Sequence, residues 1–103
     1  MIFGLRDTDI QYMQTLFDTE STIEQVWLFG SRAKGTNQVG SDVDLVLVGP
    51  AVSWQTKARI HAVLEEESPI PYFFDVVHWN TLTNENLKRE IERTAQPLYQ
   101  RPA

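Results

Sequence analysis

Two aspartates one residue apart, Asp42 and Asp44, open an apolar run and are the residues whose spacing most directly suggests chemistry. In a β-strand, residues two apart point to the same face, so the two carboxylates would lie side by side, about 7 Å apart along the backbone. Like charges held that close repel each other, and a divalent cation between them removes the repulsion. The pair therefore predicts a metal site, with Val43 directed into the core on the opposite face.

A small turn, Gly30-Ser31, follows an earlier apolar run at residues 25–29. Glycine lets a phosphate group approach the backbone, and the amides at the start of a helix, together with a serine hydroxyl, suit phosphate oxygens. Arg32 and Lys34 follow closely and add positive charge, although spacing alone does not give their directions. The sequence thus predicts a phosphate site beside the metal site.

A third carboxylate, Asp75, interrupts the apolar run at residues 72–77. If its strand neighbours the strand of Asp42 and Asp44, three carboxylates converge, and two cations roughly 3.5–4 Å apart are used for in-line displacement at phosphorus. We expect Asp42 and Asp44 to hold both ions and Asp75 to complete the ion that activates the attacking hydroxyl. Oxygen ligands favour a hard cation such as Mg²⁺. The alternative role for Asp75 is that of a hydrogen-bonded structural residue.

The elements that position these residues follow from hydrophobic periodicity and from turn residues. We expect a first helix at residues 7–20 and a brief helix at 31–34. Two later helices are expected at 53–67 and 83–93, and three strands at 25–29, 43–48 and 72–77. The order helix, strand, short helix, strand, helix, strand, helix predicts an α/β or α+β domain with one small mixed sheet flanked by helices.

The remaining polar and aromatic residues have structural interpretations. The helix at 53–67 places Trp54, Ala58, His61 and Leu64 along one stripe. His61 and His78 are interpreted as packing or surface residues, and the acidic run 65–67 as a solvated helix end. Residues 97–99 are expected to lie along the body as an extended tail, and residues 101–103 to fray.

Length and composition limit the classes of protein that this chain can represent. With 103 residues, 42% of them hydrophobic and 22% charged, it is expected to be one folded domain over residues 1–103. No apolar stretch approaches the roughly 18–20 residues of a membrane span, so no membrane association and a cytoplasmic location are expected. The absence of cysteine excludes disulfides and thiolate metal sites. A net charge of -5 argues against nucleic acid as a partner, since phosphate backbones are bound mainly through clustered Lys and Arg.

The segment Gly30-Ser31-Arg32-Ala33-Lys34-Gly35, followed by Ser41-Asp42-Val43-Asp44-Leu45, resembles the signature of the polymerase-beta-like nucleotidyltransferases. The short chain resembles their minimal nucleotidyltransferase (MNT) branch. The resemblance implies the fold of that family and transfer of a nucleoside monophosphate from a nucleoside triphosphate to a hydroxyl, with release of pyrophosphate. It implies catalytic and metal-binding roles for Asp42, Asp44 and Asp75. Nucleotide-binding roles are expected for Gly30, Ser31, Arg32, Lys34 and Ser41.

The same resemblance implies a partner and cofactors. Many minimal members are encoded beside a HEPN-domain toxin and act as its antitoxin by adenylylating a tyrosine on it. We therefore expect an Mg²⁺-dependent adenylyltransferase that uses ATP and two Mg²⁺ ions and forms a hetero-oligomer with a HEPN-domain toxin. Lys34 stands where many relatives carry arginine, which preserves the charge but not bidentate geometry.

Two other functions are compatible with the residues. The chain could be a non-catalytic nucleotide-binding module that neutralises its partner by occlusion, with Trp54, Trp79 and the aromatic residues near 69–74 as a contact surface. It could instead transfer a nucleotide to a small molecule, such as an aminoglycoside, or to an RNA end. Relatives of that kind usually carry a second domain for the acceptor, and the acidic balance disfavours RNA.

Overall fold

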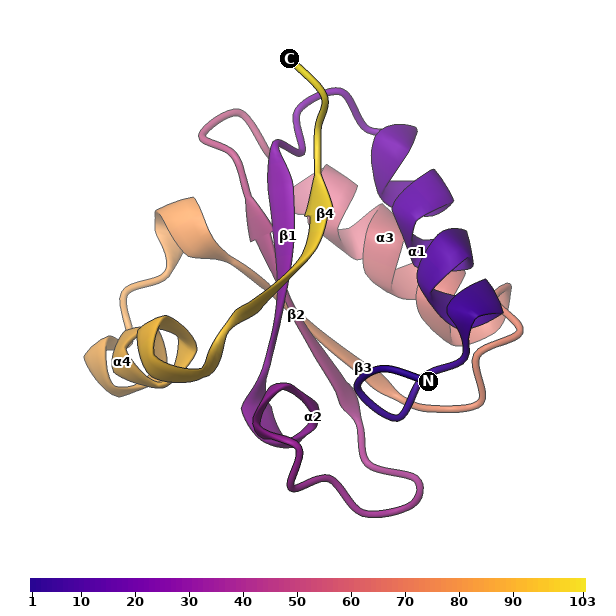
Figure 1. Ribbon diagram of the computed structural model, residues 1–103. Coiled ribbons are helices and arrows are strands. Elements are labelled where there is room, and N and C mark those ends of the chain that lie inside the picture. Colours follow the sequence, from indigo (N-terminus) through magenta and orange to yellow (C-terminus); the bar gives the residue numbers. More distant parts are fainter.

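A mixed four-stranded sheet in the order β3-β2-β1-β4 forms the centre of the molecule (Figure 1). In this computed structural model, which describes residues 1–103, the strands are β1 (Gln25–Phe29), β2 (Val43–Val48), β3 (Phe74–His78) and β4 (Gln96–Gln100). β1 lies antiparallel to β2 and β4, and β2 lies parallel to β3. A parallel pair needs a long crossover connection, and this one contains α3 (Trp54–Glu66).

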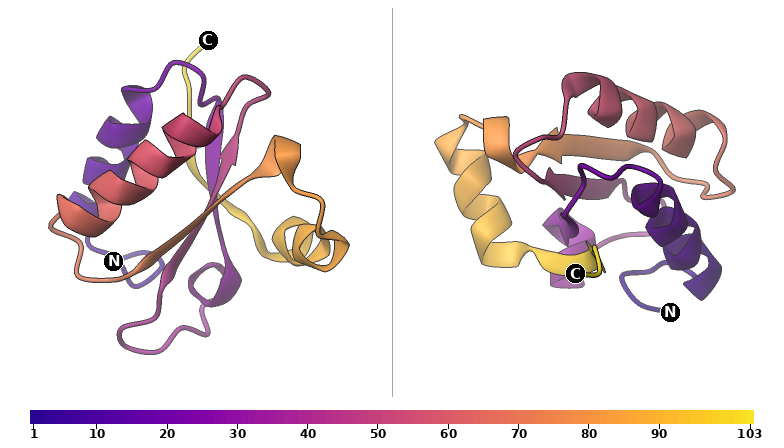
Figure 2. Two further views of the ribbon diagram at one scale, coloured as in Figure 1. Left: turned by 180° about the vertical axis from the view of Figure 1, so that it is seen from behind. Right: turned by 90° about the horizontal axis from the view of Figure 1, so that it is seen from above.

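Helices cover both faces of the sheet, but unequally (Figure 2). α1 (Asp7–Asp18) and α3 lie on one side, and α2 (Gly30–Lys34) and α4 (Glu85–Thr94) lie on the other, with the short 3-10 helix η1 (Trp79–Thr81) before α4. A cluster of 18 buried residues joins the sheet to α1 and α3. On the α4 side only Phe29, Val46 and Ile91 are buried together. The α1/α3 side therefore supplies most of the apolar burial that stabilises the fold.

The expected fold class and order of elements are confirmed. The additional strand is β4, which sequence analysis treats as an extended tail but which pairs with β1, Val26 lying opposite Tyr99. Arg101, expected to fray, donates from Nε to Ile23 O at 2.8 Å and from Nη2 to Glu20 O at 2.7 Å. The C-terminal segment is therefore fixed to the sheet and to the loop after α1.

α3 turns a different face to the core than its stripe indicates. Ile60 and Leu64 are buried, whereas Trp54, Ala58 and His61 are exposed. Burial of Ile60 and Leu64 removes only apolar surface from water, while a buried indole or imidazole needs a hydrogen-bond partner for its ring nitrogen. His61 instead remains exposed, and its Nε2 lies 3.0 Å from the carbonyl oxygen of Phe74 in β3.

The first residues form a tight turn. Leu5 N donates to Ile2 O at 2.9 Å, and the two residues between them, Phe3 and Gly4, have positive φ angles of 59° and 69°. Phenylalanine rarely adopts this conformation, so contacts outside the turn must hold it. The carbonyls of Phe3 and Gly4 accept hydrogen bonds from the Arg32 guanidinium, which supplies that constraint.

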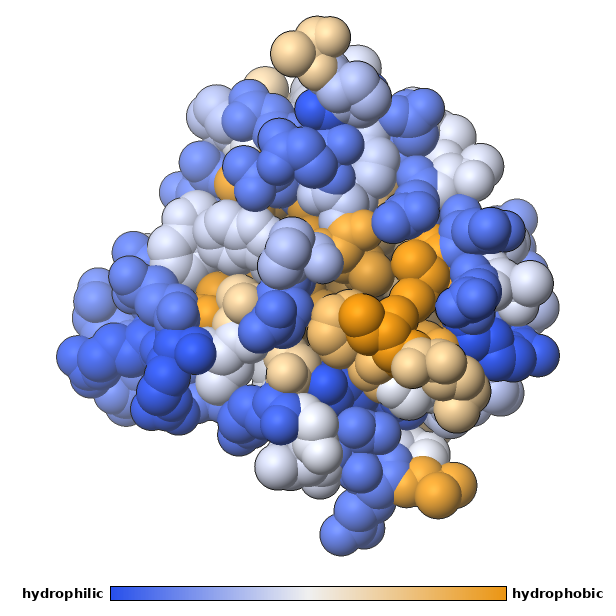
Figure 3. Space-filling model, viewed as in Figure 1, coloured by the Kyte–Doolittle hydropathy of each residue, from blue (hydrophilic) through white to orange (hydrophobic).

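The face shown in Figure 3 is hydrophilic around a central apolar area. The large apolar side chains that remain exposed in the molecule are those of Met1, Ile2, Val39, Trp54 and Phe73. No helix combines the length and apolar character that crossing a membrane requires.

Candidate functional site

Asp44 and Asp75 lie opposite each other on neighbouring strands. The parallel register pairs these two residues, which confirms that the strand of Asp75 neighbours the strand of Asp44. Val43 is buried in the main core, and because strand side chains alternate, Asp44 lies on the opposite face. Phe74 and Val76 orient Asp75 in the same way. Both carboxylates therefore belong to the face that α2 and α4 cover.

Asp42, Asp44 and Asp75 form an electrostatically coupled group. Asp42 and Asp75 are exposed, and Asp44 is partly buried. Burial raises the pKa of Asp44 to about 6, with smaller contributions from the carboxylates of Asp75 and Asp42, while the Arg32 guanidinium acts to lower it. The folded chain thus disfavours the ionised form of Asp44, mainly through loss of hydration and to a smaller extent through the two neighbouring carboxylates.

The donor set of these three residues fits a hard divalent cation. It consists only of carboxylate oxygens, which Mg²⁺ prefers, and two of the three residues are paired across neighbouring strands. No three acidic or histidine side chains are close enough together to form a preassembled metal cage. Repulsion among carboxylates opposes such a cage until a cation binds. Asp42, Asp44 and Asp75 are the residues that would hold Mg²⁺.

Gly30, the first residue of α2, lies directly against Asp44. The antiparallel register pairs Phe29 with Asp44, which brings the end of β1 beside this carboxylate. Gly30 has a φ of +76°, and a Cβ at this position would lie 2.5 Å from Asp44 Oδ2. Glycine alone suits both the conformation and the space. The predicted phosphate turn, in which the partly buried Ser31 follows, is therefore in contact with the predicted metal site.

Arg32 is buried inside this arrangement, with 2% of its surface exposed. Its guanidinium donates at 2.6–3.3 Å to four backbone carbonyls, those of Phe3, Gly4, Ser41 and Asp42. The ring of Tyr72 lies 4.3 Å from its Cζ, within the range of a cation–π interaction. One side chain thus joins the N-terminal turn, the loop before β2 and the segment before β3.

These contacts revise the role that the sequence suggests for Arg32. The sequence predicts a nucleotide contact, but the guanidinium is enclosed by carbonyl oxygens and the Tyr72 ring and does not face solvent. A buried charge needs such partners to offset the loss of hydration. Arg32 therefore positions the backbone of Asp42 at the start of β2.

Lys34 and Ser41 make contacts away from the carboxylates. Lys34 Nζ lies 3.4 Å from Glu90 Oε1 of α4, in an exposed pair. Ser41 Oγ accepts a hydrogen bond from Gln38 N at 2.9 Å and closes the turn before β2. The nucleotide-binding roles of Lys34 and Ser41 stay predictions, as do those of Gly30 and Ser31.

Sequence reasoning missed the partners of Arg32 and the surroundings of Asp75. The Phe3-Gly4 dipeptide indicates a turn, because glycine favours positive φ, but no spacing rule links residue 3 to residue 32. Trp54 and Lys57 of α3 line a pocket with Asp75. The sequence could have indicated this pocket, because the stripe of α3 that contains Trp54 and His61 is more polar than a helix face that packs into a core.

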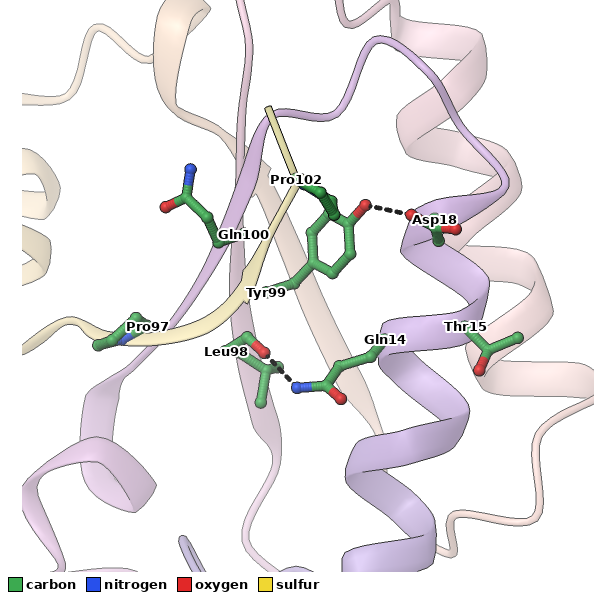
Figure 4. A pocket seen from close by; sticks show the side chains of 8 residues that line it. All are labelled: Gln14, Thr15, Asp18, Pro97, Leu98, Tyr99, Gln100 and Pro102. Carbon is green, nitrogen blue, oxygen red and sulfur yellow. Dashed lines mark hydrogen bonds between the residues drawn. The ribbon is translucent and has the colours of Figure 1, made fainter.

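A pocket of about 510 Å³ between α1 and β4 lies apart from the carboxylates (Figure 4). Within it, Gln14 Nε2 donates to Leu98 O at 2.9 Å and Tyr99 OH donates to Asp18 Oδ1 at 2.7 Å. These bonds tie the edge strand β4 to α1. No predicted site residue lines this pocket, so its polar groups are interpreted as structural.

Comparisons with known proteins agree with this geometry. The family model described as "Polymerase beta, Nucleotidyltransferase" matches residues 11–103. A solved toxin-antitoxin with AMP-PNP has a TM-score of 0.64 and 19% identity, over 94% of this chain and 75% of that chain. A mutant of the toxin-antitoxin MntA-HpeT has a TM-score of 0.71 and 19% identity, over 95% and 75% of the two chains. At such identities the likeness shows the fold, and no curated protein matches the chain.

The contact between Gly30 and Asp44 predicts different costs for two glycine substitutions. Gly35 shares the φ of +76° but has no atom within 4 Å of an added Cβ, so Gly35→Ala should cost about 1–2 kcal/mol of unfolding free energy. Gly30→Ala adds the overlap with Asp44 Oδ2 and should cost about 1–3 kcal/mol more. Urea unfolding measures both. Equal losses in the two variants would show that the overlap has no energetic effect.

Because the Arg32 guanidinium is buried, we expect Arg32→Lys to destabilise the protein by about 3 kcal/mol. A single ammonium cannot reach both the carbonyls of the N-terminal turn and those of the loop before β2. The control is Lys34→Ala, two residues along α2, whose exposed pair with Glu90 predicts a loss below about 1 kcal/mol. Chemical denaturation measures both variants. A loss for Arg32→Lys no larger than that of the control would remove Arg32 from its positioning role.

The raised pKa of Asp44 predicts a pH-dependent gain of stability in Asp44→Asn. The folded state binds the Asp44 proton more tightly than the unfolded state, so metal-free wild-type protein loses stability as pH rises from 3.8 to about 6. In EDTA at pH 7.5 the variant should melt higher, by up to about 5 °C after allowance for solvent screening, and the difference should vanish near pH 4. Asp7→Asn, on an exposed position of α1, is the control. A lower Tm for Asp44→Asn at pH 7.5 would contradict the raised pKa of Asp44.

Proposed function

The chain belongs to the polymerase beta nucleotidyltransferase family and is a nucleotidyltransferase, and from this premise we propose that it transfers AMP from ATP to a hydroxyl of a partner protein. The observation that carries the proposal is the contact of the Gly30 turn with Asp44, which in turn pairs with Asp75. A phosphate turn and a carboxylate group in direct contact suit a nucleotide whose phosphates bind through metal ions. A cytoplasmic location belongs to the same proposal.

The proposed reaction is an in-line displacement at the α-phosphorus of ATP. The acceptor oxygen forms a bond to this phosphorus, and the bond from phosphorus to the oxygen that bridges to the β-phosphate breaks, so that pyrophosphate leaves with the electron pair. The proton of the acceptor hydroxyl passes to a carboxylate oxygen of Asp75 and from there to water. The backbone at Gly30 and Ser31 holds the phosphates that leave.

Asp42, Asp44 and Asp75 would hold two Mg²⁺ ions. Their positive charge would stabilise the negative charge that develops on the phosphate oxygens and would make the hydroxyl more acidic. Arg32 does not touch the nucleotide in this proposal. It holds the carbonyls of Ser41 and Asp42, so the carboxylates at the start of β2 keep their direction. Pre-set geometry of this kind lowers the cost of reaching the transition state.

The partner in this proposal is a HEPN-domain toxin, with a tyrosine hydroxyl as the acceptor, and the chain is its antitoxin. Support comes from the structural neighbours, which are toxin-antitoxin structures, one of them with AMP-PNP. The alternative is neutralisation by occlusion, in which the chain binds its partner without transfer. Transfer to a small molecule or to an RNA end is a further alternative, and the net charge of -5 disfavours RNA as the acceptor.

Transfer of labelled AMP to the co-purified toxin in the presence of Mg²⁺ and α-labelled ATP tests the proposal. Asp42→Asn with Asp44→Asn should lower the rate by roughly three orders of magnitude or more, about 4 kcal/mol of activation free energy. Asp7→Asn carries the same change of charge on an exposed helix and should label the toxin at the wild-type rate. Wild-type labelling by the double variant would refute the mechanism.

Growth of cells that express the toxin separates catalysis from occlusion. The wild-type chain should restore growth, and the Asp42→Asn, Asp44→Asn variant should not, although both bind the toxin in a pull-down experiment. Full protection by the double variant would establish occlusion in place of catalysis.

A further inference from the structure

The outer edge of β3 is covered at its first residue by two side chains of α3. β3 is an edge strand, with β2 on one side and no strand on the other. The backbone N–H of Phe74 donates to Glu65 Oε1 at 2.7 Å, and Phe74 O lies 3.0 Å from His61 Nε2. A carbonyl oxygen only accepts, so Nε2 is the nitrogen of His61 that carries the proton. Glu65 and His61 thus take the place of the neighbouring strand that β3 lacks there.

Glu65 differs from the solvated helix end that the sequence suggests for residues 65–67. Its side chain is 23% exposed, whereas Glu66 and Glu67 are exposed. His61 Nε2 lies 3.4 Å from Glu65 Oε1, so the two side chains meet at the same point of the strand. A hydrogen bond from a backbone N–H to a carboxylate is stronger than one to a neutral acceptor. Glu65 therefore has a specific contact to β3.

The peptide group between Phe73 and Phe74 is held from both sides of β3. On the side of β2, Phe73 O accepts a hydrogen bond from Val43 N at 2.9 Å. On the side of α3, Phe74 N donates to Glu65 at 2.7 Å. Because a peptide group is planar, two bonds on opposite sides fix its orientation about the strand. Without Glu65, only the bond to β2 would remain.

This peptide group lies next to the carboxylates of the site. Phe74 directly precedes Asp75, and Asp75 pairs with Asp44 across the parallel strands. A side chain follows the orientation of its own backbone, so a rotation of the strand at Phe74 would move the Asp75 carboxylate relative to Asp44. The bond from Phe74 N to Glu65 opposes that rotation.

We propose that Glu65 is a positioning residue for the metal site, and that its bond to Phe74 N keeps the Asp75 carboxylate beside Asp44. His61 supports the same strand at Phe74 O. Glu65 is not a metal ligand in this proposal, because α3 packs on the face of the sheet opposite the carboxylates. The inference rests on the metal-binding part of the proposed function, but not on the transfer of AMP.

Three substitutions at position 65 separate the hydrogen bond from the charge. Glu65→Gln keeps an acceptor oxygen at the same distance and removes the charge. Glu65→Asp keeps the charge but is one methylene shorter, and Glu65→Ala removes both. Mn²⁺, which also prefers oxygen ligands, is titrated without nucleotide or toxin, and the free ion is measured by electron paramagnetic resonance. The Kd for Mn²⁺ should rise about three- to tenfold in Glu65→Asp and Glu65→Ala and stay within about twofold of wild type in Glu65→Gln.

Two variants of α3 are the controls, and both should bind Mn²⁺ as the wild type does. Glu66→Ala removes the adjacent exposed carboxylate. Ser53→Ala removes the N-terminal cap of α3, in which Ser53 Oγ accepts a hydrogen bond from Thr56 N at 3.1 Å, and so weakens the same helix away from Phe74. A rise of Kd in Ser53→Ala as large as that in Glu65→Asp would reduce the effect to helix stability and overturn the positioning role.

The remaining outcomes are equally decisive. The same Kd in wild type, Glu65→Asp and Glu65→Ala would overturn the proposal, because the bond would then not affect the site. A loss in Glu65→Gln as large as that in Glu65→Ala would overturn it too, since charge would then account for the effect. If the wild-type chain binds no Mn²⁺, the metal site fails and the positioning role fails with it.

Transfer of labelled AMP to the co-purified toxin separates this inference from the proposed function. Glu65→Asp should lower kcat about tenfold with the KM for ATP unchanged, and Glu65→Gln should restore kcat. Wild-type kcat in Glu65→Asp would overturn the positioning role and leave nucleotidyl transfer intact. If the wild-type chain labels no protein, the proposed transfer fails, while the Mn²⁺ titration still decides whether Glu65 positions the carboxylates.

Discussion

The hydrogen bonds of the buried Arg32 guanidinium are the interaction on which the site depends. They reach the N-terminal turn and the loop before β2, and the Tyr72 ring packs against the same group just before β3. Two of these segments lead directly into the strands that carry Asp44 and Asp75. A planar group with several fixed donors can join them, which a lysine cannot do. The charge is buried at little cost because carbonyl oxygens replace its water.

The carboxylate group opposes the stability that Arg32 provides. Asp44 is partly buried beside two other carboxylates, and its raised pKa records the cost of ionising it there. Gly30 adds a backbone conformation and a tight contact that no other residue tolerates. Such local costs are typical of functional sites. The large core under α1 and α3 offsets these costs, and it lies on the face of the sheet opposite the carboxylates.

The edge position of β3 connects the site to the outside of the molecule. A central strand would have a further strand beyond Asp75, whereas β3 is an edge strand, and Asp75 lines a pocket with Trp54 and Lys57 of α3. Asp75 is itself exposed, so its carboxylate is open to the surface of the molecule.

The sequence alone determined the elements that depend on local patterns. Periodicity located the helices and three strands, alternation placed Asp44 on one face of its strand, and the glycine turn marked the end of β1. Only the tertiary structure decided that Asp75 pairs with Asp44, that residues 96–100 form a fourth strand, and that Arg32 turns inward to residues 3, 4, 41, 42 and 72. These are contacts between distant segments, and composition and spacing describe a chain only along its length. The direction of Arg32 shows the reason: the same guanidinium suits a phosphate or a carbonyl, and which one it meets depends on where the backbone places it.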